Sequence, residues 1–154
     1  MDANVLVALA DDHDDLHARA IRDLKRLGRG PFGSTAPVLS ETFYLLSRGH
    51  LRLRLRSYLK RLHVAIVEMP ADAWDDIFDW MDHYQEHQPD LADAQLVALS
   101  TMDASCRVWT YDKEFFAVWR RSDGTRVPTA LRRPIQAGGG TVKIGRSHSL
   151  FLLR

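Results

Sequence analysis

The chain has 154 residues, 45% of them hydrophobic, which is enough for one well-buried core and too few for two ordinary domains. No run approaches the roughly 18 apolar residues that a membrane-spanning helix needs, and a single cysteine, Cys106, excludes an internal disulfide. The formal net charge is only +1, so charge alone neither favours nor excludes a nucleic-acid partner.

Hydrophobic periodicity and turn residues predict helices that alternate with short buried strands. The helices are expected over residues 14–29, 37–48, 51–62, 71–87 and 91–104, and the strands over 63–69 and 106–110. In the helix over 71–87, side chains such as Ile77 and Phe78 are expected to face inward. The alternation predicts an α/β sandwich with a mostly parallel sheet, whose ligand site lies beyond the carboxyl ends of its strands.

Charge is unevenly distributed along the chain. Residues 48–61 carry basic side chains and no acid, residues 62–106 contain neither Lys nor Arg, and no acid follows Asp123. A Gly-Gly-Gly run at 138–140 precedes a basic segment that ends in apolar residues 150–153. We therefore expect a domain over residues 1–133 and a basic, glycine-containing tail over 134–154 that is loosely attached or docks onto a neighbour.

Four short acidic segments interrupt apolar runs, namely Asp-Ala-Asn at 2–4, Ser-Glu-Thr at 40–42, Asp-Leu-Ala-Asp-Ala at 90–94 and Thr-Tyr-Asp at 110–112. An unpaired carboxylate at the end of a buried element costs several kcal/mol, so this pattern indicates a shared cation. Oxygen ligands without a Cys/His set favour Mg²⁺ or Mn²⁺, and substrate phosphate oxygens commonly complete a Mg²⁺ shell. Phosphodiester hydrolysis is the chemistry that matches.

A rival motif is the sequence His83-Tyr84-Gln85-Glu86-His87, which has the H-x-x-E-H form of an inverted zinc-peptidase motif. No third ligand follows in a suitable context, and the Glu and His side chains share a face with several aspartates of the same predicted helix. A solvated acidic helix face is therefore the better interpretation.

The four acidic segments, with the apolar residues beside them, resemble those of the PIN-domain ribonucleases, in particular the VapC-type toxins. The similar segments are Asp-Ala-Asn-Val-Leu-Val-Ala-Leu at 2–9, Pro-Val-Leu-Ser-Glu-Thr-Phe-Tyr-Leu-Leu at 37–46, Leu-Ala-Asp-Ala-Gln-Leu-Val-Ala at 91–98 and Val-Trp-Thr-Tyr-Asp-Lys-Glu-Phe at 108–115. Their order and spacing extend the resemblance over residues 1 to about 118.

The resemblance implies a PIN-like three-layer α/β/α sandwich and a Mg²⁺- or Mn²⁺-dependent endoribonuclease that leaves a 5′-phosphate and a 3′-hydroxyl. It implies four metal-binding catalytic acids, which are Asp2, Glu41, Asp93 and Asp112. Asn4 and Thr110 resemble the polar residues that steady this cluster.

The same resemblance implies a cytoplasmic homodimer that acts on RNA as the toxin of a type II toxin–antitoxin system and is silenced by a cognate antitoxin. An alternative from another class is a PIN-fold protein that binds nucleic acid or a partner without cutting. In that alternative the acidic site is incomplete, because only Met1 precedes Asp2 where the family has several strand residues.

Two further groups remain open to two interpretations. Asp90 is either an additional ligand or the N-cap of the helix that follows Pro89, and the cap is favoured. Arg52, Arg54 and Arg56 either bind RNA phosphates or form a solvated or partner-binding face.

Overall fold

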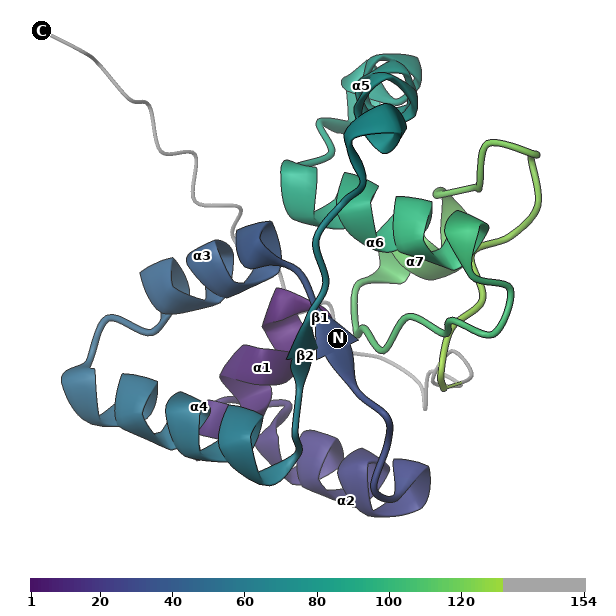
Figure 1. The fold of residues 1–154 in the computed structure, drawn as a ribbon. Helices are drawn as coiled ribbons and strands as arrows, with labels where there is room; N and C mark the ends of the chain where they lie inside the picture. The colour runs from purple at the N-terminus through teal and green to yellow at the C-terminus, as the bar shows by residue number, and fades with distance from the viewer. Residues whose placement is uncertain (132–154) are drawn as a thin grey trace, which may run out of the picture.

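The structure is a computed structural model that describes residues 1–131; the predicted tail over 134–154 lies outside the described residues. Among the described residues the fold contains two short strands, six helices of at least eight residues each, one helix of five residues and two 3-10 turns (Figure 1). The elements are α1 (Ala3–Ala10), α2 (His17–Leu27), β1 (Gly33–Ser34), α3 (Ala36–Leu45), α4 (Gly49–Arg61), β2 (Ala65–Ile66), η1 (Ala71–Ala73), α5 (Trp74–His83), η2 (Gln85–His87), α6 (Leu91–Met102) and α7 (Lys113–Ala117).

A small parallel sheet lies at the centre of the molecule. β1 pairs with β2 in parallel, with Gly33 opposite Ala65. Backbone hydrogen bonds continue beyond β1, because the Met1 nitrogen donates to Gly33 O (2.6 Å) and the Asp2 nitrogen donates to Trp109 O (3.0 Å). Residues 1–2 thus lie between β1 and the segment around residue 109, where they bring Asp2 to the end of the sheet.

Both strands predicted from the sequence are shorter in the structure than expected. Of residues 106–110, Val108 alone forms a bridge, in parallel with Thr129, and the strand expected over 63–69 is reduced to β2. The Val108 nitrogen donates to Pro128 O (2.8 Å), so backbone pairing nevertheless extends to the far edge. The α/β fold with a parallel sheet is confirmed, with strands that are very short.

Helix α1 forms the middle of the core. It is apolar on nearly every side, and Val5, Leu6 and Leu9 are buried. A helix of this kind must be surrounded by other elements, and α2, α3 and α4 pack around α1 while α5 covers α6 (Figure 1). Helix α3 also contacts α6, and this contact sets the position of the acidic segments carried by these two helices.

The helix predicted over 71–87 is divided into η1, α5 and η2. Ile77 faces the core as expected, whereas the prediction for Phe78 is wrong, because 52% of Phe78 is exposed and its ring lies against Trp74 (centroids 5.7 Å apart). No helix within residues 1–131 combines the length and the apolar character needed to cross a membrane.

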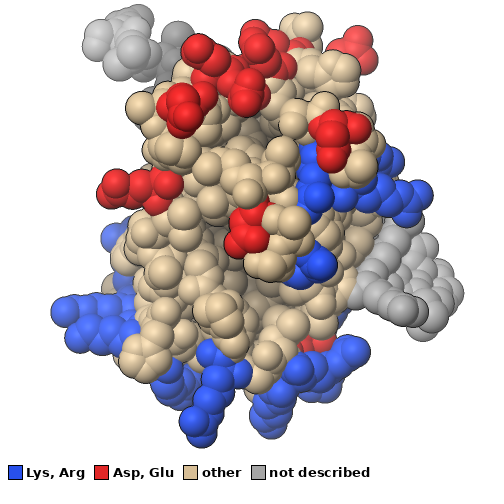
Figure 2. Space-filling model, turned by 45° about the vertical axis from the view of Figure 1, so that its right-hand side comes forward, with Lys and Arg blue, Asp and Glu red and all other residues tan. Residues whose placement is uncertain are grey.

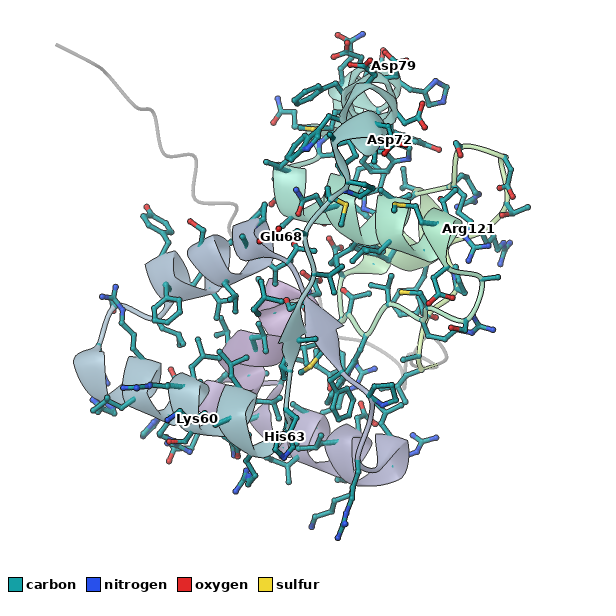
Figure 3. All side chains as sticks on the ribbon, viewed as in Figure 1. Lys60, His63, Glu68, Asp72, Asp79 and Arg121 are labelled. Carbon is teal, nitrogen blue, oxygen red and sulfur yellow. The ribbon has the colours of Figure 1, made fainter. Side chains whose placement is uncertain are left out.

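Opposite charges gather at opposite ends of the molecule. Figure 2 shows acidic side chains over one end and most basic side chains over the other, with a further basic group on the right of the upper half. The acidic end is that of η1 and α5, where Asp72 and Asp79 lie, and Lys60 and His63 lie at the other end (Figure 3). The uneven charge along the sequence therefore becomes a division of the surface.

Candidate metal centre

Asp2 is held by three hydrogen bonds at the start of α1. It is the N-cap of this helix, and its Oδ1 accepts from the Ala3 nitrogen (2.6 Å). Its Oδ2 accepts from Thr110 Oγ1 (2.5 Å) and Asn4 Nδ2 (2.6 Å). The two residues predicted to steady the acids thus both contact one of them, and Asp2 is only 5% exposed.

Thr110 and Asn4 also fix the turn that carries Asp112. Asp112 is the N-cap of α7, where its Oδ1 accepts from the Glu114 nitrogen (3.0 Å). Its own nitrogen donates to Thr110 Oγ1 (2.9 Å), and the neighbouring Tyr111 nitrogen donates to Asn4 Oδ1 (3.1 Å). Thr110 and Asn4 therefore join the turn that carries Asp112 to the start of α1.

The remaining acids come from α3 and α6. Glu41 lies on α3 and is partly buried, and Asp93 lies in the first turn of α6. Asp90 is the N-cap of α6, as the sequence indicates, and its Oδ1 accepts from the Asp93 nitrogen (2.8 Å). Glu41 and Asp90 both line a cavity of about 540 Å³ between the N-terminal turns of these two helices.

The acids influence one another electrostatically. Burial raises the pKa of Asp2 to about 6, and the charge of Asp112 adds to the rise. Burial, followed by the charges of Asp90, Asp2 and Asp112, raises the pKa of Glu41 to about 7. Burial and the same three neighbours raise the pKa of Asp93 further above its ordinary value. Carboxylates that oppose each other's ionisation form one electrostatic cluster, and a divalent cation would relieve the repulsion.

The four acids offer the ligand atoms that a hard divalent ion prefers, although their carboxylate oxygens do not converge closely on one position. All the candidate donors are oxygens, which suit Mg²⁺ or Mn²⁺. Within residues 1–131, however, only Asp11, Asp12 and His13 bring three potential ligand atoms within 4.8 Å of one another. An ion that keeps several waters, as Mg²⁺ does, can be held by carboxylates that stand further apart.

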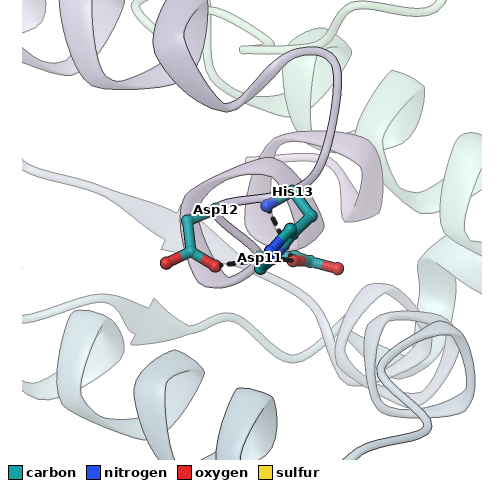
Figure 4. A group of neighbouring side chains, drawn as sticks. All are labelled: Asp11, Asp12 and His13. Atoms are coloured by element: carbon teal, nitrogen blue, oxygen red, sulfur yellow. Dashed lines mark hydrogen bonds and ion pairs between the residues drawn. The ribbon is translucent and has the colours of Figure 1, made fainter.

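The group of Asp11, Asp12 and His13 is an ion-paired surface turn (Figure 4). His13 Nδ1 lies 3.1 Å from Asp12 Oδ1, and Arg54 Nη1 lies 2.9 Å from Asp12 Oδ2. The hydrogen bond from Arg54 lowers the pKa of Asp12, in contrast to the raised values of the central acids. Since Arg54 already neutralises Asp12, the group of Asp2, Glu41, Asp93 and Asp112 is the better candidate for a divalent ion.

The zinc-peptidase interpretation of the H-x-x-E-H motif finds no support in the geometry. The helix ends at His83, and Glu86 and His87 belong to the separate turn η2, so the two imidazoles do not stand one turn apart on one helix. The rings instead pack against neighbours, with His83 against Tyr84 (4.7 Å) and His87 against Trp119 (5.8 Å between centroids).

The three arginines predicted to bind substrate have different surroundings. Arg52 donates to two carbonyls at the end of α3, those of Leu46 (2.7 Å) and Phe43 (2.9 Å), which have no partner within the helix. Arg54 pairs with Asp12, and Arg56 is exposed on α4. Arg56 is thus the member of the set best placed to meet a ligand.

Replacing Arg52 with Lys is expected to destabilise the protein by about 1 kcal/mol, because an ammonium group cannot reproduce the two-carbonyl contact of a guanidinium. Urea unfolding measures the change, and Arg56→Lys on the same helix is the matched control. Equal stability of the two variants would show that the Arg52 contacts contribute nothing.

A second network, which sequence reasoning missed, supports the Asp112 turn from α2. The Tyr111 hydroxyl donates to Asp23 Oδ2 (3.2 Å), and Asp23 is only 6% exposed. Arg19 Nε lies 3.4 Å from the same carboxylate oxygen, and the Arg19 guanidinium lies 4.4 Å from the centre of the Tyr111 ring. Burial raises the pKa of Tyr111 to about 12, so the hydroxyl remains a donor. The sequence signal that could have indicated this network is a single aspartate, Asp23, among the basic residues of α2.

Tyr111→Phe is expected to lower the free energy of unfolding by about 1 to 3 kcal/mol, since a buried carboxylate loses a donor. Asp23→Asn should reduce this cost in a double-mutant cycle, because the two residues act on each other. Tyr58→Phe is the control, as its ring also stacks with an arginine, Arg61. A Tyr111 effect no larger than that of Tyr58 would contradict the network.

Comparison with known proteins agrees with the geometry. The family model described as "PIN domain" matches residues 1–120, so the chain belongs to the PIN-domain family. A crystal structure of VapC20 from Mycobacterium tuberculosis, a toxin that cleaves the sarcin–ricin loop, is similar with a TM-score of 0.62 and 24% identity. The similarity covers 75% of this chain and 91% of that chain, and at this identity it establishes the fold. No curated protein matches.

Proposed function

We propose that this protein is a divalent-metal-dependent endoribonuclease and the toxin of a type II toxin–antitoxin pair. The observation that carries the proposal is the electrostatic cluster of Asp2, Glu41, Asp93 and Asp112 in a PIN-domain chain. The similarity in fold to VapC20, a ribonuclease toxin, supports the choice of RNA and of the toxin class.

The four acids would hold Mg²⁺ or Mn²⁺, which when bound lowers the pKa of water and offsets the negative charge that develops on a phosphoryl group. The chain's own contribution is orientation. Thr110 and Asn4 fix Asp2 Oδ2. Thr110 also accepts from the Asp112 nitrogen, so it holds Asp112 in a fixed position relative to Asp2. Such pre-positioned carboxylates need little rearrangement as the reaction proceeds.

RNA contact is best supported at the basic end of the molecule. Arg56 on α4 and the exposed cations Arg22, Lys25 and Arg29 in and just after α2 supply positive charge without an ion pair to an acid among the described residues. Cations of this kind bind phosphates with an affinity that falls as salt rises.

Association with an antitoxin and with a second copy of the chain completes the proposal. Large apolar side chains are exposed on α3 and α4, including Tyr44 (66%), Leu45 (51%) and Leu53 (64%). Surfaces of this type commonly mark protein–protein contacts. We place the protein in the cytoplasm, where its RNA substrate and a cognate antitoxin would be available.

Incubation of the purified protein with RNA tests the proposal. Cleavage is expected with Mn²⁺ or Mg²⁺, should stop on addition of a chelator, and should leave 5′-phosphate and 3′-hydroxyl ends. Absence of metal-dependent cleavage under conditions where the protein is folded would favour the alternative, a PIN-fold protein that binds without cutting.

A further inference from the structure

The cavity beside the acids is a groove open to solvent, with the volume of a ligand site. Its volume is about 540 Å³, within the roughly 300 to 1,000 Å³ of ligand pockets. It lies between the N-terminal turns of α3 and α6 and is lined by Ala36, Pro37, Ser40, Glu41, Asp90, Leu91 and Ala92. A second cavity, between α5 and α6, measures only about 60 Å³ and is too small for such a ligand.

The lining favours an uncharged, flat ligand over a phosphate. Most of the wall is apolar, and neither Lys nor Arg lines it. Its two charged residues, Glu41 and Asp90, are both acids and would repel an anion. Pro37 and Leu91 are partly exposed and come from the two different helices, so they offer apolar surface on two sides of the space.

The position of the cavity connects it to the bond that would be cut. Glu41 belongs both to the cavity wall and to the acidic cluster, and Asp90 caps the helix turn that carries Asp93. A phosphate held at the acids therefore has its attached nucleoside within reach of this space. Single-stranded RNA presents bases that can leave the stack and enter apolar pockets.

We propose that this cavity receives the unstacked base of a nucleotide adjoining the scissile phosphate, between Pro37 and Leu91, with Asp90 accepting from the base edge. The Oδ1 atom of Asp90 is used by the Asp93 nitrogen, and no hydrogen bond within the described residues uses Oδ2. A carboxylate oxygen accepts and does not donate, so it selects bases that carry amino or imino N–H groups on that edge. This inference rests on the proposed function, because it takes RNA as the ligand.

Short synthetic RNAs spanning the bond that the wild-type protein cuts provide the test, with a single abasic position moved along the strand. One position beside the cut is expected to lower kcat/KM by about 10-fold or more, as loss of a stacked base typically does. Abasic substitutions elsewhere should have little effect.

Ala36→Leu narrows the cavity from an exposed position, and Ala71→Leu on η1 is the matched control. The Ala36→Leu variant should cut the intact RNA as slowly as the wild-type protein cuts the RNA with the sensitive abasic position. Its kcat/KM should not fall further when it is given that abasic RNA. If Ala36→Leu proves unfolded by circular dichroism, Leu91→Ala, which removes one wall, is expected to show the same loss of base dependence.

Binding of labelled single-stranded RNAs that carry the same abasic scan needs no known cleavage site, and fluorescence anisotropy of these RNAs separates this inference from the proposed function. Absence of cleavage together with base-dependent binding that Ala36→Leu removes would overturn the nuclease and retain the base site. Cleavage that is indifferent to every abasic position, or an Ala36→Leu profile equal to the wild type, would overturn the base site and leave the nuclease. RNA that is neither cut nor bound in a base-dependent way would overturn both.

Discussion

Asp93→Asn is expected to lower metal-dependent RNA cleavage by about 10²- to 10³-fold or more, because it removes a ligand charge at nearly constant shape. The same change should stabilise the metal-free protein at neutral pH. The pKa of Asp93 is raised by burial and by Asp90, Asp2 and Asp112, so its ionisation opposes folding and an amide avoids that cost.

Asp79→Asn is the matched control, since Asp79 is exposed on α5 at the acidic end of the molecule (Figure 3). It should change neither cleavage nor melting temperature. Undiminished cleavage by Asp93→Asn, in a preparation free of contaminating nuclease, would remove Asp93 from the site. A fall in activity accompanied by a fall in metal-free stability would indicate that the substitution damages the fold.

The metal-free protein is expected to lose stability as the pH rises from about 4 to about 7. The folded-state pKa values of Asp2 (about 6) and Glu41 (about 7) lie above their ordinary values of 3.8 and 4.5. Between the ordinary and the raised values the folded state holds more protons than the unfolded state, so the free energy of unfolding falls with rising pH. The favourable contribution of Asp2 and Glu41 to the free energy of unfolding is fully present below about pH 4 and absent above about pH 7, and that of Asp93, whose pKa is raised to about 9, is lost at higher pH.

Adding Mg²⁺ near pH 7.5 should restore the lost stability, because an ion that binds only the folded state adds about 2.7 kcal/mol at 100 times its dissociation constant. Chemical unfolding in chelator at several pH values, repeated with Mg²⁺, measures both effects. Stability that is independent of pH between 4 and 7 and unresponsive to Mg²⁺ and Mn²⁺ would contradict a shared cation site.

Three of the four acids have a local signal in the sequence, because Asp2 and Asp112 cap helices and Asp93 lies in the first turn of one, whereas Glu41 lies in the middle of α3. Asp2, Asp90 and Asp112 are observed N-caps, and an aspartate before an apolar helical run is a strong local signal. Order and spacing then indicated the family. The resemblance to that family then indicated Asn4 and Thr110, which lie within the same segments and both contact Asp2.

Features that depend on tertiary contacts were not readable from the sequence. The predicted strands shrink to a few paired residues because neighbouring segments, and not their own propensity, decide how far pairing extends. Helix 71–87 divides near Tyr84, where the rings of Trp80, Tyr84 and Trp119 pack together. The Asp23–Tyr111 bond joins residues 88 positions apart, and no local pattern reports such a contact.

Counting bound Mn²⁺ by electron paramagnetic resonance in wild type and two variants tests the central claim most directly, because the chain offers two acidic groups. One variant is Asp93→Asn, and the other combines Asp11→Asn with Asp12→Asn in the surface turn (Figure 4). We expect Mn²⁺ affinity to fall at least about 10-fold in Asp93→Asn. Loss of a residue that only supports a metal ligand typically lowers affinity by about that factor, and loss of a ligand itself should lower it by no less. The surface-turn variant should bind as wild type does. Binding that survives Asp93→Asn and disappears from the surface-turn variant would contradict the assignment of the metal centre to Asp2, Glu41, Asp93 and Asp112.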